Sequence, residues 1–173
     1  MLNKQMNIIL IGHMGTGKTT VGKQLSKTLN KPFIDIDQYI EKKTGVKIPL
    51  IFEYEGEVGF RSRESRALEE LANYSNSIFA TGGGIVLLKK NRDALSRLGV
   101  IFYLNTDSNT LCERLKSDKK RPLLANVDIN EKINTLFKER NSLYESISDF
   151  IIDTKQKKIV NIVSEILEKM KLK

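Results

Sequence analysis

The chain contains one cysteine, Cys112, and no long apolar run. A single cysteine excludes an internal disulfide and leaves no second thiol for a structural zinc site. No stretch approaches the roughly 20 apolar residues of a membrane-spanning helix, and residues 1–6 lack the charged-then-apolar order of a signal peptide. Internal repeats, linkers and low-complexity tracts are absent as well. We therefore expect a single cytoplasmic domain over residues 1–173, with no membrane partner.

Acidic residues are outnumbered by basic ones, 21 against 29, which gives a net charge of +8. Such an excess is typical either of a nucleic-acid surface or of a protein that binds small anionic substrates. Residues 155–173 alone supply +4 of this charge, and no aromatic residues lie between their lysines. We therefore expect small-molecule substrates and no nucleic acid as partner. The alternative from another class, a nucleic-acid-binding NTPase, predicts binding that weakens steeply with salt.

Five short apolar segments have the composition of buried parallel strands: 7–11, 33–34, 77–80, 100–104 and 150–152. Helical patterns lie between them, clearest over 159–170, where apolar residues recur on one helix face. The alternation predicts an α/β fold with a parallel sheet covered by helices on both faces. Segments 38–74 and 117–130 fit this rhythm poorly and are candidates for a substrate platform and a mobile lid.

Residues 12–19 read Gly-His-Met-Gly-Thr-Gly-Lys-Thr and match the G-x-x-x-x-G-K-[ST] phosphate-binding pattern. The segment lies between a predicted strand and a predicted helix, as the mechanism requires. In such a loop, backbone N–H groups surround the phosphates, Lys18 reaches the β- and γ-phosphates, and Thr19 offers its hydroxyl to Mg²⁺. His13 occupies an unrestricted position of the pattern, and we expect it to face solvent.

The acid pair Asp35-Ile36-Asp37 follows the second predicted strand. Alternate residues of a strand point to the same side, so one carboxylate could face the metal and the other an acceptor hydroxyl. The other interpretation is that Asp37 caps a helix beginning at Gln38. The two interpretations are compatible.

Three glycines, Gly82, Gly83 and Gly84, end the strand at 77–80 and permit close approach of the backbone to a ligand. Arg61, in Gly59-Phe60-Arg61, and Arg140, in Glu139-Arg140, could each grip a carboxylate or phosphate bidentately. Arg121, in an irregular charged stretch, suits a lid that carries an arginine onto a transferring phosphate. For Arg61 and Arg140 taken singly, a solvated surface charge is the simpler interpretation, and for Arg121 the alternative is a charged loop tip.

Taken together, these motifs resemble the shikimate kinase family, over a region from about Asn7 to about Ile166. Six motifs occur in order: residues 12–19, Asp35-x-Asp37, Gly59-Phe60-Arg61 with Glu64, residues 82–84, Arg121-Pro122-Leu123-Leu124, and Glu139-Arg140 followed by Leu143-Tyr144. The resemblance implies a nucleoside-monophosphate-kinase-like fold with a five-stranded parallel sheet, a substrate-binding region near 33–75 and a lid near 113–126. It also implies transfer of the γ-phosphate of ATP to the 3-hydroxyl of shikimate, a step toward the aromatic amino acids.

The resemblance further implies roles for individual residues. The phosphates would lie against Gly15, Thr16, Gly17, Lys18, Thr19 and Thr20. Mg²⁺ would be held by Thr19 and, through water, by Asp35. Shikimate would be bound by Asp37, Arg61, Gly82, Gly83, Gly84 and Arg140. Asp37 would orient or deprotonate the accepting hydroxyl, while Lys18 and Arg121 neutralise charge on the phosphoryl group. Arg114 would lie near the adenine, and Lys157 in the loop on the adenine side.

Two further expectations complete this interpretation. No apolar stripe is left over once the core is assigned, so we expect a monomer. A kinase of the same fold for another small polyol acid, such as gluconate, or for a nucleotide is the nearest alternative. It would keep the phosphate-binding loop and lid but need a different acceptor pocket from that predicted around Asp37 and Arg61.

Overall fold

The structure is a computed structural model that describes residues 6–116 and 128–172. Its centre is a five-stranded parallel sheet of order β2-β3-β1-β4-β5. The strands are β1 (Ile8–Ile11), β2 (Phe33–Asp35), β3 (Ile78–Ala80), β4 (Val100–Asn105) and β5 (Phe150–Asp153). The five predicted segments are thus confirmed to within one residue at either end. The parallel register follows from the alternation of strand and helix along the chain.

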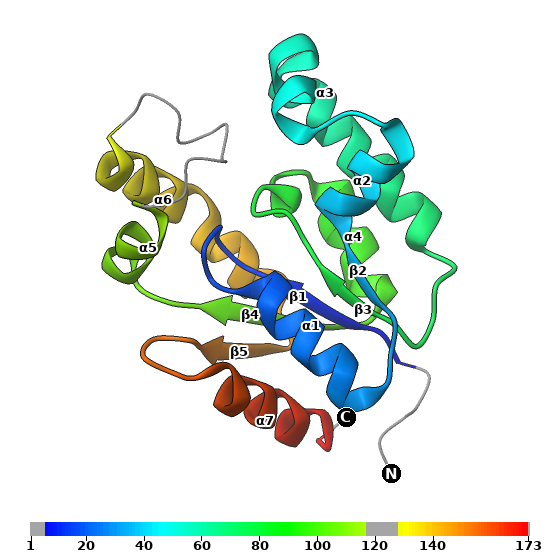
Figure 1. Ribbon diagram of the computed structural model, residues 1–173, viewed down its shortest axis with the longest axis vertical. Coiled ribbons are helices and arrows are strands. Elements are labelled where there is room, and N and C mark those ends of the chain that lie inside the picture. Colours follow the sequence, from blue (N-terminus) through cyan, green and yellow to red (C-terminus); the bar gives the residue numbers. More distant parts are fainter. Residues whose placement is uncertain (1–5, 117–127, 173) are drawn as a thin grey trace.

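Helices cover both faces of the sheet (Figure 1). They are α1 (Lys18–Leu29), α2 (Ile36–Thr44), α3 (Ile48–Leu71), η1 (Ile85–Leu87), α4 (Lys89–Leu98), α5 (Ser108–Leu115), α6 (Ile129–Ile147) and α7 (Ile159–Met170). On one face, Ile8 and Leu10 pack with Val21 of α1 and Ile166 of α7. The opposite side chains of the same strands pack with α2, α3, α4 and α6. Because neighbouring strand residues point to opposite faces, one short apolar strand supplies both cores.

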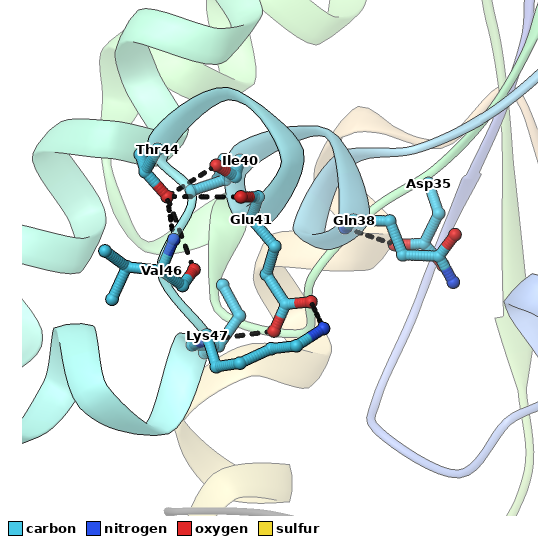
Figure 2. A network of polar contacts seen from close by, with 8 residues as sticks. Asp35, Gln38, Ile40, Glu41, Thr44, Val46 and Lys47 are labelled. Atoms are coloured by element: carbon cyan, nitrogen blue, oxygen red, sulfur yellow. Dashed lines mark hydrogen bonds and ion pairs between the residues drawn. The ribbon is translucent and has the colours of Figure 1, made fainter.

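The connection between α2 and α3 is held by side chains of α2 (Figure 2). The Thr44 hydroxyl donates to the Ile40 carbonyl at 2.8 Å and accepts from the Val46 N–H at 3.2 Å. The Glu41 carboxylate accepts from the Ile48 N–H at 3.0 Å and pairs with the Lys47 ammonium at 2.8 Å. These contacts satisfy backbone groups at a helix end and fix the start of α3 relative to α2.

Helix α3 is interrupted at Gly56, whose backbone (φ 67°, ψ −174°) is not helical. The break separates a first segment from the longer second segment, which carries Arg61 and Glu64 into the core region. Over the described ranges 6–116 and 128–172, no helix combines the length and apolarity needed to cross a membrane.

Candidate active site

The phosphate-binding loop, residues 12–19, lies at the carboxyl end of β1, the central strand between β3 and β4. The chain leaves β1 toward β2 on one side and reaches β4 on the other, so this is the point where the strand order reverses. Ligands of open α/β sheets bind at such points. A cavity of about 290 Å³ opens here, lined by Gly15, Lys18, Thr19, Asp35, Asp37, Gly82, Gly83 and Arg114, among others.

The loop geometry suits an anion at the start of α1. Gly17 caps the helix with a left-handed backbone and no side-chain hydrogen bond, and the first turn holds no acidic residue. The Lys18 ammonium lies back along the loop and donates to the carbonyls of Gly12 and His13 at 2.8 and 2.7 Å. A helix start without a side-chain cap and a buried lysine at the same place suit a bound anion.

Thr19 and Asp35, the two residues predicted to hold Mg²⁺, are in contact. The Thr19 hydroxyl donates to Asp35 Oδ2 at 2.8 Å, although the two residues are 16 positions apart. Mg²⁺ takes few protein ligands and completes its shell with water and phosphate oxygens. Among the described residues no cluster of three or more acidic, histidine or cysteine side chains exists. The Thr19 hydroxyl and the Asp35 carboxylate therefore suit a Mg²⁺ ion that is bound together with the phosphates of a nucleotide. They are too few for a site in which the protein supplies every ligand.

We expected Asp35 and Asp37 to share one side of a strand, and this expectation was wrong. Asp35 is the last residue of β2, and Asp37 already lies in the first turn of α2. Asp35, not Asp37, caps this helix by accepting from the Gln38 N–H at 3.3 Å (Figure 2). Both carboxylates nevertheless line the same cavity, because the chain turns sharply from strand into helix between them.

Asp37 lies beside a second carboxylate, Glu64, at the glycine-rich end of β3. A Cβ added at Gly82 would come within 2.8 Å of Glu64 Oε1 and 2.9 Å of Asp37 Oδ1. Only glycine leaves room for both carboxylates at this point. Glu64 is fully buried, and burial raises its pKa to about 7, although Arg61 acts in the opposite direction.

The two predicted arginines are buried beside these carboxylates. Arg61 of α3 and Arg140 of α6 are 7% and 4% exposed, which excludes the interpretation of solvated surface charges. Arg61 donates to Glu57 and Glu64, and its guanidinium lies against Gly84, where a Cβ would come within 2.5 Å of Nη1. Both arginines line an open cavity of about 660 Å³ between α3, η1 and α6. This neighbouring cavity offers two cations to an anionic group.

A family model for shikimate kinases matches residues 14–171. The chain belongs to the shikimate kinase family. It is 47% identical to a shikimate kinase of Aromatoleum aromaticum over 86% of this chain and 85% of that protein. It is 46% identical to one of Buchnera aphidicola over 96% and 99% of the two chains. Both proteins are matched over most of their length, so the family covers the whole arrangement described above.

Solved structures agree with this membership. The shikimate kinase of Acinetobacter baumannii in complex with shikimate superposes with a TM-score of 0.93, at 41% identity over 96% of this chain and 93% of that one. A gluconokinase of Sinorhizobium meliloti superposes with a TM-score of 0.55 at 17% identity, over 96% and 92% of the chains. The second likeness is one of fold, so the gluconate-type alternative gains no support beyond the shared architecture.

In this shikimate kinase family member, His13 is buried, and the expectation of a solvent-facing residue was wrong. Its ring stacks on Phe137 at 4.3 Å and meets the edge of Tyr144 at 4.8 Å. Burial, together with the positive charges of Lys18 and Arg140, lowers the pKa of His13 to about 3. The ring is therefore a neutral aromatic contact between the phosphate-binding loop and α6 at physiological pH.

Tyr144 was present in the predicted motif but had no assigned role. It is fully buried, and its hydroxyl donates to the Gly83 carbonyl. Its ring also stacks on Tyr103 of β4 at 5.0 Å. The residue ties the glycine-rich loop after β3 to α6, the helix that carries Arg140. The spacing of Tyr144, one helical turn after Arg140, was the available signal.

The remaining predicted residues have different outcomes. Arg114 donates to the carbonyls of Gly15 and Thr154 at 3.2 and 3.3 Å, so it joins the phosphate-binding loop to the segment after β5. The Lys157 ammonium instead pairs with Glu165 at 2.7 Å, outside the residues that line the 290 Å³ cavity. Arg121 and most of the predicted lid fall within 117–127, outside the described residues.

Proposed function

We propose that this chain transfers the γ-phosphate of ATP to the 3-hydroxyl of shikimate, giving shikimate 3-phosphate and ADP. The observation that carries the proposal is the shared cavity. Thr19 and Asp35 on the nucleotide side, and Asp37 and Gly82 on the acceptor side, open into the same space of about 290 Å³. Family membership supplies the substrate class, and the two buried arginines supply a binding site for its carboxylate.

Each side chain has a physical reason for its role. Arg61 and Arg140 hold the shikimate carboxylate by charge-assisted hydrogen bonds. Asp37 accepts the proton of the 3-hydroxyl while the oxygen of that hydroxyl forms a bond to the γ-phosphorus of ATP. The bond between the γ-phosphorus and the bridging β-phosphate oxygen breaks, and ADP leaves. Lys18 exchanges the carbonyls of Gly12 and His13 for phosphate oxygens and stabilises the charge on the transferring group.

Thr19 and Asp35 would hold Mg²⁺, the hydroxyl directly and the carboxylate through water. The ion, when bound with ATP, neutralises charge on the β- and γ-phosphates. Arg114, whose guanidinium donates to the Gly15 carbonyl, would contact the nucleotide. Arg121, the other arginine assigned to the phosphates, lies outside the described residues. We further propose that a monomer of one domain acts in the cytoplasm, where its co-substrate ATP is found.

A coupled ADP-release assay with Mg-ATP tests the function directly, with shikimate, gluconate, AMP or no acceptor. Turnover confined to shikimate is the expected result. Turnover with gluconate or AMP would retain a kinase but refute the pocket built on Asp37, Arg61 and Arg140. Stimulation by DNA or RNA without any small acceptor would favour the nucleic-acid-dependent alternative instead.

A further inference from the structure

The guanidinium group of Arg61 is already occupied by two carboxylates of its own chain. Its Nε and Nη2 atoms donate to one oxygen of Glu57 at 3.2 and 2.9 Å, and its Nη1 atom donates to Glu64. The Glu57 contacts use the Nε–Nη2 edge of the guanidinium, which is an edge that binds a carboxylate bidentately. A carboxylate that binds Arg61 bidentately through this edge therefore competes with a glutamate that already occupies it.

The two glutamates differ in how readily they can leave. The Glu64 side chain is fully buried, with the charges of Asp37 and Arg140 nearby. The Glu57 side chain is 47% exposed and lines the open cavity of about 660 Å³ together with Arg61 and Arg140. Glu57 can move into water at little cost, so it is the residue that gives way.

The backbone beside Glu57 supports this assignment. Glu57 directly follows Gly56, where α3 is broken by a residue with φ 67°. A Cβ at Gly56 would meet nothing within 4 Å, so glycine is required there by its backbone and not by packing. The break places Glu57 at the start of the helical segment that carries Arg61, one turn before it, where an ion pair with a residue four positions later is favoured.

We propose that Glu57 is a specificity-determining residue that competes with the acceptor carboxylate for Arg61. An acceptor that carries a carboxylate replaces Glu57 and restores the charge balance of the buried arginine. A neutral polyol leaves the internal ion pair in place and gains nothing from Arg61. The inference rests on the proposed function, because it takes Arg61 as an anchor for the shikimate carboxylate.

This competition lowers the apparent affinity for shikimate in the wild-type protein. When only a fraction of the molecules has Arg61 available, the apparent dissociation constant rises by the inverse of that fraction. Half-exposed ion pairs are weak, so we expect the competition to weaken binding by about two- to fivefold. Glu57→Gln keeps the shape of the side chain and removes its charge, and Glu57→Ala removes the competitor entirely.

The experiment compares steady-state kinetics of the wild type, Glu57→Gln and Glu57→Ala, with Glu55→Gln as matched control. Glu55 lies on the same segment, but its carboxylate pairs with Arg63 at 2.5 and 2.8 Å instead of with Arg61. We expect both Glu57 variants to lower the KM for shikimate by about two- to fivefold with an unchanged KM for ATP. The control should not change either constant. With shikimate methyl ester, which lacks the negative charge, the Glu57 variants should show no gain.

A higher KM for shikimate or a lower kcat in the Glu57 variants would overturn the proposal, because it would mean that Glu57 holds Arg61 in its working position. An unchanged KM, or an equal gain with the methyl ester, would overturn it too. These outcomes require an active wild type. A wild type that does not phosphorylate shikimate refutes the proposed function itself, so the two failures are distinguishable. Calorimetric titration with shikimate in the absence of ATP measures the dissociation constant directly. It allows the wild type and the variants to be compared without turnover.

Discussion

A single methyl group at Gly84 should disable the carboxylate anchor without touching the nucleotide site. The backbone of Gly84 has φ −96° and ψ 0°, which alanine adopts without strain. The added Cβ, however, would lie 2.5 Å from Nη1 of Arg61 and closer still to Nη2 and Cζ. Real Cβ atoms keep at least 3.0 Å from their neighbours, so the guanidinium must withdraw.

The expected size of the effect follows from the hydrogen bonds that the shift removes. A hydrogen bond to a charged group contributes about 1.5–3 kcal/mol, and every 1.4 kcal/mol is a factor of ten in affinity. Withdrawal of Arg61 costs the shikimate carboxylate one or more such bonds. We therefore expect Gly84→Ala to raise the KM for shikimate by about 10- to 100-fold. Because Gly84 is not among the residues that line the 290 Å³ cavity, the KM for ATP should stay the same.

The coupled ADP-release assay, run with each substrate varied in turn, measures both constants. Thermal unfolding of the variant provides the control for folding, since the end of a flexible arginine side chain can move without disturbing the core. An unaltered KM for shikimate in a folded Gly84→Ala protein would refute the role of Arg61. An equal rise in both KM values would show that the methyl group disturbs the phosphate-binding loop as well.

Three further predictions concern the residues around this anchor. Asp37→Asn should reduce kcat by about 10²- to 10⁴-fold while ATP binding, followed by titration, stays intact; retained turnover would show that another group positions the hydroxyl. Tyr144→Phe removes the donor to the Gly83 carbonyl and should lower the free energy of unfolding by about 1–3 kcal/mol, measured by denaturant titration; unchanged stability would mean that this hydrogen bond is not needed. The pKa of Glu64, about 7 in the folded protein, lies above its ordinary value of 4.5, so the folded state holds this proton more tightly. Stability contributed by that proton is complete below pH 4.5 and is lost as the pH rises through 7, by up to about 3 kcal/mol. Glu64→Gln should lack this loss, and parallel stability curves of variant and wild type between pH 4.5 and 7 would contradict the assignment.

The strands and the place of the phosphate-binding loop could be predicted because each depends on local spacing or on topology. Five apolar segments that alternate with helices permit few arrangements, and parallel strands bring their carboxyl ends to one edge of the sheet. Asp37 lines the cavity beside the phosphate-binding loop, but the parity argument does not explain its position. Strand parity does not apply to it, because the helix begins at Ile36.

The burial of His13 and the surroundings of the Glu57–Arg61 pair could not be predicted from local sequence. A histidine in a glycine-rich loop is compatible with an exposed position unless a distant aromatic residue covers it, and Phe137 does so from α6. The spacing of four residues permits an ion pair between Glu57 and Arg61, but the break at Gly56 and the burial of Arg61 are not visible in that spacing. Both properties arise from tertiary packing, which overrides the pattern of neighbouring residues.

The burial of Arg61 explains why this arginine pairs with a carboxylate of its own chain. An uncompensated arginine that is 7% exposed would destabilise the folded protein strongly, because desolvation of a lone charge is costly. Glu64 lies against this arginine, but burial raises the pKa of Glu64 to about 7, so its negative charge is incomplete near neutrality. Glu57 supplies a second carboxylate that keeps Arg61 compensated in the absence of substrate. The same group must then leave when shikimate binds, so stability of the free protein and affinity for the acceptor are opposed at this one residue.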